Sequence, residues 1–204
     1  MPGSLSRGPN PNYVRSFVAV EIPDDVRADI GRLISHLRAR NYPVRWVSPG
    51  NLHLTLMFLG ENPPDFTLRV RECLMRATTG VAEFSMSLSG LGAFPNERSA
   101  RVVWLGVEKG RGELTSLAER VKNELATVGF VPDRASFSAH LTIGRVRERL
   151  SDARSILERP FAAHPFLVTC IVHLRSTLQP GGPVYEELAA FPLESTKLQV
   201  SSSK

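Results

Sequence analysis

Two short stretches decide the fold of this chain: HLTL at His53–Leu56 and HLTI at His140–Ile143. Both have the order His, apolar, Thr, apolar, and both lie in apolar runs that predict β-strands. Successive side chains of a strand point to opposite faces, so the His and the Thr of each stretch share one face. The apolar residues point the other way, into a core. Two such strands predict the two sides of one cleft, each lined by a His/Thr pair.

A pair of histidines facing one cleft indicates acid–base chemistry. The ordinary pKa of a histidine is about 6.5, so its ring can take or give a proton near neutrality. One neutral and one protonated histidine form a base and an acid for in-line displacement at phosphorus. The hydroxyls of Thr55 and Thr142 can donate hydrogen bonds to the non-bridging phosphate oxygens. This arrangement needs no metal.

Two other interpretations of these histidines were weighed. A single His on a strand is usually a hydrogen-bonded polar residue without a catalytic role, and only the repetition of the whole pattern favours catalysis here. Zinc is the other alternative, because histidine is a common zinc ligand. Neither His53 nor His140 has a nearby Cys pair, a His-x-x-x-His pattern, or an Asp or Glu at ligand spacing. We therefore expect no metal and no cofactor.

The sequence resembles the 2H phosphoesterases, and more narrowly their RNA 2′,3′-cyclic phosphodiesterase branch, historically called 2′-5′ RNA ligases. The resemblance covers residues 13–193 and rests on the two motifs and their flanks. The matching stretches are RSFVAVEIP at Arg15–Pro23, VRWV at Val44–Val47, NLHLTLMFLG at Asn51–Gly60, GLGAFP at Gly90–Pro95, FSAHLTIGR at Phe137–Arg145 and GPVY at Gly182–Tyr185.

This resemblance implies an enzyme that opens RNA 2′,3′-cyclic phosphate ends by hydrolysis and leaves a 2′-phosphate. It also implies that His53 is the proton donor, that His140 is the proton acceptor, and that Arg145 contacts the substrate phosphate. The residues themselves do not fix this division, because the two motifs are nearly equivalent. Three alternatives stay open: reversible 2′-5′ RNA ligation, a cyclic phosphodiesterase for small nucleotides, and a non-catalytic RNA-binding module.

Four further residues are candidates for substrate binding. Strict alternation from His140 would send Arg145 to the core side, but Gly144 could let the strand end or twist so that the guanidinium turns to the cleft. Arg45 could hold a phosphate, and Trp46 could stack on a base, although packing is the commoner role of a tryptophan. Phe17, in the first strand, is the fourth candidate. His36, His164 and His173 have no following x-Thr and are expected to be structural.

Composition indicates the class of protein, its partners and its compartment. The 204 residues are 42% hydrophobic and 22% charged, ordinary values for a globular domain with a substantial core. A formal charge of +5 leans towards polyanionic partners such as RNA. Two cysteines without a disulfide framework favour a reducing compartment, and no apolar stretch reaches the ~18 residues of a membrane helix. We expect a cytoplasmic monomer that contacts no membrane.

The pattern of elements predicts an α+β fold. Residues 1–12 and 195–204 are expected to be polar tails, with a single bilobal domain at 13–194. Each lobe should be a mainly antiparallel sheet with helices on its outer side, facing its partner across a central cleft. We expect helices at residues 24–39, capped by Asp24, and at 65–77, 112–128 and 151–158, capped by Ser151. Strands are expected at residues 13–22, 44–47, 52–59, 84–91, 101–107, 137–144, 166–174 and 184–191, with Gly60 ending the third.

Overall fold

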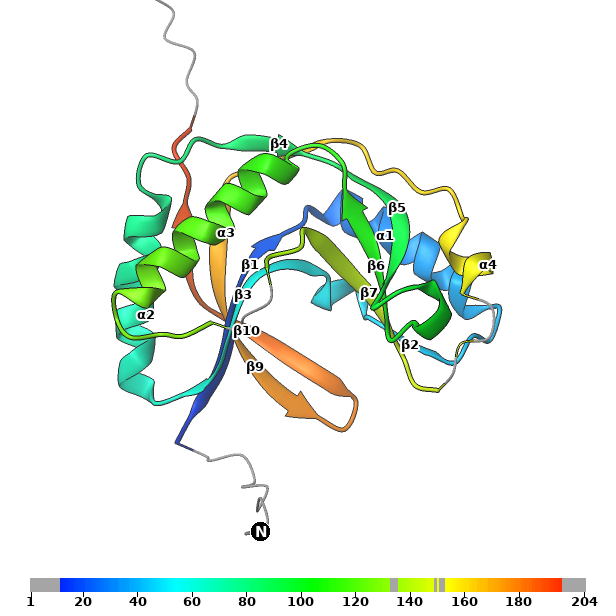
Figure 1. Cartoon of the computed structure of the whole chain (residues 1–204), viewed down its shortest axis with the longest axis horizontal. Coiled ribbons are helices and arrows are strands. Elements are labelled where there is room, and N and C mark those ends of the chain that lie inside the picture. Colours follow the sequence, from blue (N-terminus) through cyan, green and yellow to red (C-terminus); the bar gives the residue numbers. More distant parts are fainter. Residues whose placement is uncertain (1–11, 133–135, 149, 151–152, 196–204) are drawn as a thin grey trace, which may run out of the picture.

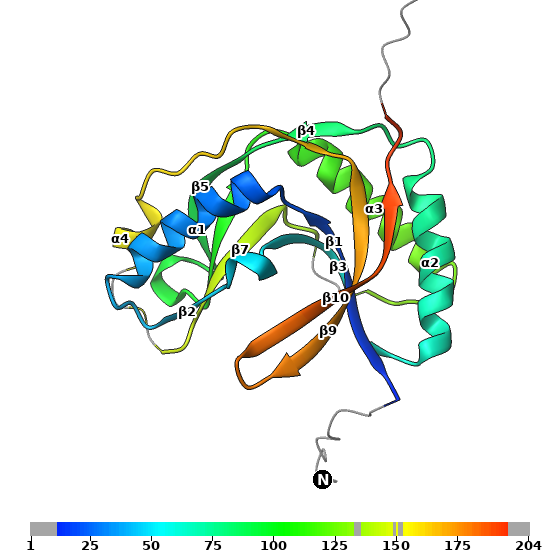
Figure 2. The same cartoon turned by 180° about the vertical axis from the view of Figure 1, so that it is seen from behind.

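The computed structural model describes residues 12–132, 136–148, 150 and 153–195. The two predicted tails, and the predicted cap Ser151, therefore lie almost wholly outside the described residues. The described strands form two four-stranded antiparallel sheets and one two-stranded sheet. Figures 1 and 2 show each larger sheet at the centre of a lobe, with helices on the outside. The predicted α+β class with two facing lobes is confirmed.

The first lobe is built on a sheet with the strand order β10-β9-β1-β3. Its strands are β1 (Val14–Glu21), β3 (His53–Asn62), β9 (Cys170–Gln179) and β10 (Gly182–Pro192). Two helices pack against each other on its outer side (Figure 1): α2 (Pro64–Thr78) and α3 (Arg111–Ala126). The sheet therefore combines strands from the two ends of the chain.

The second lobe is built on a sheet with the strand order β2-β7-β6-β5. Its strands are β2 (Val44–Trp46), β5 (Leu88–Phe94), β6 (Val102–Val107) and β7 (His140–Val146). Helices α1 (Asp24–Arg38) and α4 (Arg154–Leu157) lie beside this sheet in both views. The lobes are thus not consecutive halves of the chain, because α1 lies on the second lobe between two strands of the first.

The remaining elements are short. Strands β4 (Phe84–Met86) and β8 (Phe166–Val168) pair with each other, and two 3₁₀ turns, η1 (Pro49–Asn51) and η2 (Glu97–Ser99), lie in the loops before β3 and β6. The helices that the structure describes include none long and apolar enough to cross a lipid bilayer.

The predicted apolar stripe of α1 forms core. Val26, Ile30 and Leu37 are fully buried, at the helical spacing that puts them on one face. Asp24 does not cap this helix as predicted: Pro23 is the N-cap residue, and Asp24 is the first helical residue. A carboxylate there still suits the positive end of the helix dipole.

Several predicted boundaries are wrong. The predicted strand at residues 166–174 is split at Thr169 into β8 and β9, which belong to different sheets. The predicted strand at residues 84–91 is split at Ser87 into β4 and β5, which belong to different sheets. The predicted end of this strand at residue 91 is also wrong, because β5 continues to Phe94 to pair with β6. Gly60 does not end its strand, since β3 runs on to Asn62, and the φ of +73° at Gly60 is accommodated next to a register shift. In each case the pairing partner, rather than the local sequence, sets the limit.

Candidate active site

Strands β3 and β7 present the two motifs as the alternation predicts. Leu54 and Leu141 are 1% and 0% exposed in the core, whereas the flanking motif histidines and threonines are half-buried. All four motif polar residues, His53, Thr55, His140 and Thr142, line one cleft of about 700 Å³. A volume of this size is typical of a small-molecule or cofactor site.

A β-bulge follows the threonine in both motif strands. In β3 the register passes from Ala19↔Thr55 to Val18↔Met57, which leaves Leu56 unpaired. In β7 it passes from Trp104↔Thr142 to Val103↔Gly144, which leaves the equivalent Ile143 unpaired. An extra residue changes the face to which the following side chains point.

The bulge at Ile143 explains how Arg145 reaches the cleft. Strict alternation would have sent the guanidinium into the core, but after the extra residue Gly144 is buried and Arg145 is exposed and lines the cleft. Gly144 is needed at the buried position, because a Cβ there would lie 2.6 Å from Val44 Cγ1 and 2.9 Å from Trp46 Cε3.

Each motif histidine is held by the backbone two residues before it. His53 Nδ1 lies 2.8 Å from the Asn51 carbonyl oxygen, and His140 Nδ1 lies 2.7 Å from that of Ser138. A carbonyl oxygen only accepts hydrogen bonds, so each Nδ1 carries the hydrogen. The matching bonds fix the ring orientations and leave Nε2 of each ring available to a ligand.

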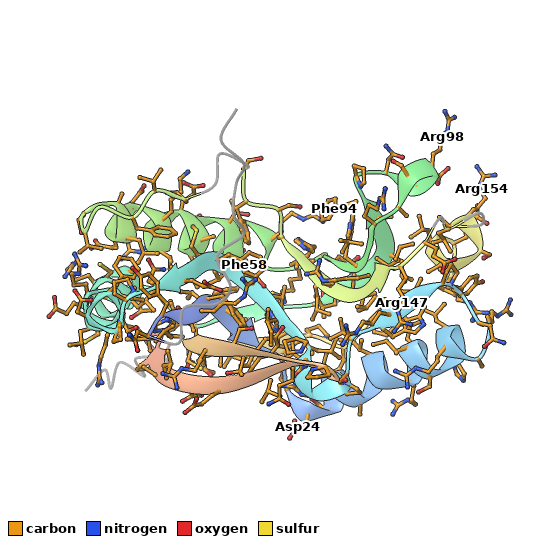
Figure 3. The ribbon with its side chains drawn as sticks, turned by 90° about the horizontal axis from the view of Figure 1, so that it is seen from below. Asp24, Phe58, Phe94, Arg98, Arg147 and Arg154 are labelled. Carbon is orange, nitrogen blue, oxygen red and sulfur yellow. The ribbon has the colours of Figure 1, made fainter. Side chains whose placement is uncertain are left out.

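Aromatic rings pack against each histidine. The Phe17 and Tyr185 rings have their centroids 4.7 and 5.2 Å from that of His53. On the other lobe the Phe94 ring lies 4.9 Å from His140, with Trp104 behind it at 6.3 Å. Figure 3 shows Phe58 and Phe94 on opposite lobes, near the space between them.

Tyr185, Phe94 and Phe58 also line the cleft, and sequence reasoning missed all three as site residues. All three stand in stretches that carry the family resemblance, Phe58 in NLHLTLMFLG, Phe94 in GLGAFP and Tyr185 in GPVY, and this was the available clue.

Of the other three candidates for substrate binding, two line the cleft and one does not. Arg45 is exposed and lines the cleft. Trp46 also lines it but is 9% exposed, and its ring packs against Gly144. Phe17 is 3% exposed and lies behind His53, so it supports the ring of His53 instead of lining the cleft. The remaining histidines lie elsewhere: His36 is exposed, His164 bonds Asp25, and His173 is buried in the sheet.

Burial shapes the electrostatics of His53. Desolvation, with smaller effects of the nearby Arg27 and Arg145 charges, lowers the pKa of His53 to about 4, although the bond to Asn51 acts in the opposite direction. Arg27, on α1, donates hydrogen bonds to the carbonyls of Ile22, Pro49 and Leu52 and so ties together the backbone that leads into β3. In the free protein His53 is therefore neutral at pH 7.

No group of three or more His, Cys, Asp or Glu side chains converges as a metal site within the described part of the chain. Arg45, Lys122 and Arg145 bring positive charge to the cleft. The carboxylate of Glu119, also on its lining, is engaged by Lys122 at 3.1 Å. The cleft therefore offers two imidazoles, two hydroxyls and a surplus of cations, which suits an anionic phosphate ester.

Comparisons with known proteins agree with this geometry. The family model of LigT-like phosphoesterases matches the chain twice, at residues 20–104 and 105–185. The chain is 39% identical over 181 residues to an RNA 2′,3′-cyclic phosphodiesterase of Archaeoglobus fulgidus, covering 87% of this chain and 99% of that protein. A protein of the same name from Thermotoga maritima is 35% identical over 176 residues, covering 86% and 93%.

Solved structures show the same fold. The structure of TT0787 of Thermus thermophilus superposes with a TM-score of 0.76 at 29% identity, covering 90% of this chain and all of that one. The structure of Escherichia coli LigT complexed with 3′-AMP superposes with a TM-score of 0.73 at 27% identity, covering 89% and 98%.

Proposed function

The chain belongs to the family of LigT-like phosphoesterases, and from this membership we propose that it hydrolyses RNA 2′,3′-cyclic phosphate ends to 2′-phosphomonoesters without a metal. The observation that carries the proposal is the matched pair of histidines in one cleft, each with Nδ1 bonded to a backbone carbonyl and Nε2 left for a ligand. The names of the relatives and the 3′-AMP in the E. coli LigT structure support a nucleotide phosphate as the substrate.

The reaction is an in-line displacement at phosphorus. Water attacks the phosphorus, and His140 Nε2 accepts the proton that the water loses. The bond from phosphorus to the 3′ oxygen breaks, and His53 Nε2 donates a proton to that oxygen. The products are a 3′-hydroxyl and a 2′-phosphate, and the two histidines have exchanged protonation states.

His53 must carry a proton to act as the donor, although its pKa is about 4 in the free protein. A bound phosphate brings negative charge next to the ring, and an opposite charge within a few ångströms favours the protonated form. The same anion offsets the positive charge of Arg145, which opposes protonation of His53. The bound substrate thus supplies the negative charge that favours protonated His53, which is the form that can act as an acid.

The remaining cleft residues bind the phosphate. The hydroxyls of Thr55 and Thr142 donate to its non-bridging oxygens from opposite lobes, and Arg145 adds a charge-assisted hydrogen bond. Such donors stabilise the transition state because negative charge builds up on these oxygens. We further propose that the protein is a cytoplasmic monomer whose partner is RNA.

A defined oligoribonucleotide with a 2′,3′-cyclic phosphate end tests the proposal. Incubation in ¹⁸O-labelled water should yield a 2′-phosphomonoester with one labelled oxygen, identified by ³¹P NMR and mass spectrometry. A 3′-phosphate product would show that the 2′ oxygen leaves instead. No turnover by the parent protein would overturn hydrolysis, and joining of ends with a 5′-hydroxyl RNA would favour the ligase alternative.

A further inference from the structure

Two arginines lie directly opposite each other at one end of the cleft. Arg45 of β2 and Arg145 of β7 are Cα partners in the antiparallel register. Directly opposite residues share one face of the sheet, with their Cα atoms about 4.5–5.5 Å apart. Both side chains are exposed, and both line the cleft. Like charges in this cross-strand relationship destabilise a sheet.

Nothing that the structure describes offsets this repulsion. No ion pair or side-chain hydrogen bond joins either guanidinium to another described residue. Glu119, the acidic residue on the cleft lining, is already paired with Lys122. The two arginines therefore form a site for negative charge that comes from outside the chain.

The hairpin between β9 and β10 approaches the Arg45 guanidinium on one side. A Cβ on Gly182 would lie 3.0 Å from Arg45 Nη2, so the hairpin backbone is in close contact with this group. Asn51 Nδ2 donates to the Pro183 carbonyl at 2.8 Å, which ties the hairpin to the residues just before His53. The hairpin limits the positions open to the Arg45 guanidinium on this side, so less side-chain freedom remains to be lost on binding.

This basic end of the cleft is the end where His53 lies. Arg145 is close enough to affect the pKa of both His53 and Tyr185, and Tyr185 stacks edge-on against His53. In the proposed reaction His53 protonates the leaving 3′ oxygen, so the ribose of the terminal nucleotide lies on this side. The next phosphate of an RNA chain is attached to the 5′ oxygen of that same ribose.

We propose that Arg45 binds the phosphodiester on the 5′ side of the terminal nucleotide, next to the reacting phosphate held by Arg145. The substrate class is then the end of an RNA chain and not a mononucleotide. This inference rests on the proposed function and names the substrate of that same site.

Two dinucleotide substrates measure the contact between Arg45 and the phosphodiester separately from the other substrate contacts. Both end in a 2′,3′-cyclic phosphate, but one has an ordinary phosphodiester linkage and the other an uncharged methylphosphonate linkage. We expect the parent protein to prefer the charged linkage by about tenfold to a hundredfold in kcat/KM, the usual effect of one hydrogen bond to a charged group. Arg45→Gln should lose this preference and turn over the two substrates at similar rates, whereas Arg45→Lys should keep part of the preference.

Arg98→Gln is the matched control, because Arg98 is also exposed and projects away from the body of the protein (Figure 3). It should keep the parent preference. The salt dependence gives a second readout: the slope of log kcat/KM against log salt for the charged dinucleotide should be shallower by about 0.7 in Arg45→Gln, the value for one contact to a single strand.

The outcomes distinguish this inference from the function on which it rests. Equal turnover of both dinucleotides by the parent protein, or an unchanged preference in Arg45→Gln, overturns the Arg45 contact and leaves the hydrolysis intact. Failure to open either substrate overturns both. Titration with the 2′-phosphorylated dinucleotide product adds a readout independent of turnover: its affinity should fall by a similar factor in Arg45→Gln, and an unchanged affinity would count against the contact.

Discussion

Phe58 and Arg145 occupy equivalent positions in the two motif strands, three residues after the motif threonine and beyond a matching bulge. Both side chains line the cleft, and Phe58 is 60% exposed. One strand thus contributes an aromatic ring where the other contributes a cation. Two near-identical motifs are placed in different surroundings, and this difference allows their histidines to take different roles.

The first prediction concerns these roles. His53→Ala and His140→Ala should each lower kcat by about 10²–10⁴, the usual contribution of one general acid or base. A nitrophenyl phosphodiester substrate has a leaving group that needs no proton, so it should restore most of the rate of His53→Ala and little of that of His140→Ala. Restoration of His140→Ala instead would exchange the two roles. If neither variant differs from the parent on any cyclic phosphate, the phosphoesterase hypothesis is falsified.

The second prediction concerns pH. The pH dependence of kcat/KM reports the free enzyme, and that of kcat reports the complex. Turnover needs protonated His53 together with neutral His140, so the limbs of the pH profile are set by the pair and not by either residue alone. Because burial lowers the pKa of free His53 to about 4 and a bound phosphate should raise it, the alkaline limb should lie at higher pH in kcat than in kcat/KM. If the alkaline limbs of kcat and kcat/KM coincide, the bound substrate does not raise the pKa of His53.

The third prediction concerns the threonines. Thr55→Val and Thr142→Val keep the shape of the side chain and remove one donor to the phosphate. The loss of a hydrogen bond to a charged group costs about 1.5–3 kcal/mol, or about tenfold to a hundredfold in kcat/KM. Thr115→Val is a control, because Thr115 is an exposed threonine on α3 that bonds within its own helix. Parent-like turnover by both cleft variants would place the phosphate elsewhere.

The fourth prediction concerns metals. If the two histidines alone carry the acid–base work, turnover of a 2′,3′-cyclic nucleotide should be the same in excess EDTA as in its absence. The assay should use protein from which metals have been removed by dialysis against chelator, with metal content measured afterwards. Loss of activity in chelator that one metal restores would contradict the mechanism.

The fifth prediction concerns stability. His173 is 1% exposed, its Nε2 has no hydrogen-bond partner among the residues that the structure describes, and burial lowers its pKa to about 4. Since the unfolded chain takes up this proton at about pH 6.5, the free energy of unfolding should fall as the pH decreases from about 6.5 to 4. Urea unfolding should show a smaller fall in His173→Leu than in the parent, and His36→Gln, at an exposed site, should match the parent. Burial also lowers the pKa of His53, so the free energy of unfolding of His173→Leu should still fall somewhat as the pH decreases.

The sequence predicted those parts of the fold that depend on local periodicity. The alternation around His53 and His140 and the stripe of α1 are confirmed because each follows from which face is buried. The final position of Arg145 could not be derived from alternation, since it depends on a bulge imposed by pairing with β6. Tyr185 was missed because it lies more than 100 residues from His53 in sequence and reaches it only through the pairing of β10 with β9 and of β9 with β1.

The interleaving of the two lobes has a consequence for how the protein is made. Strand β1 is synthesised before the other strands of its sheet, but its neighbour β9 (Cys170–Gln179) follows some 150 residues later. Until then the ribosome-bound chain presents an unpaired β1 edge, an aggregation hazard for a nascent protein. Pairing at such long range also slows folding. We therefore expect the first lobe to close only after β9 and β10 leave the ribosome, and the cleft to gain its hairpin last.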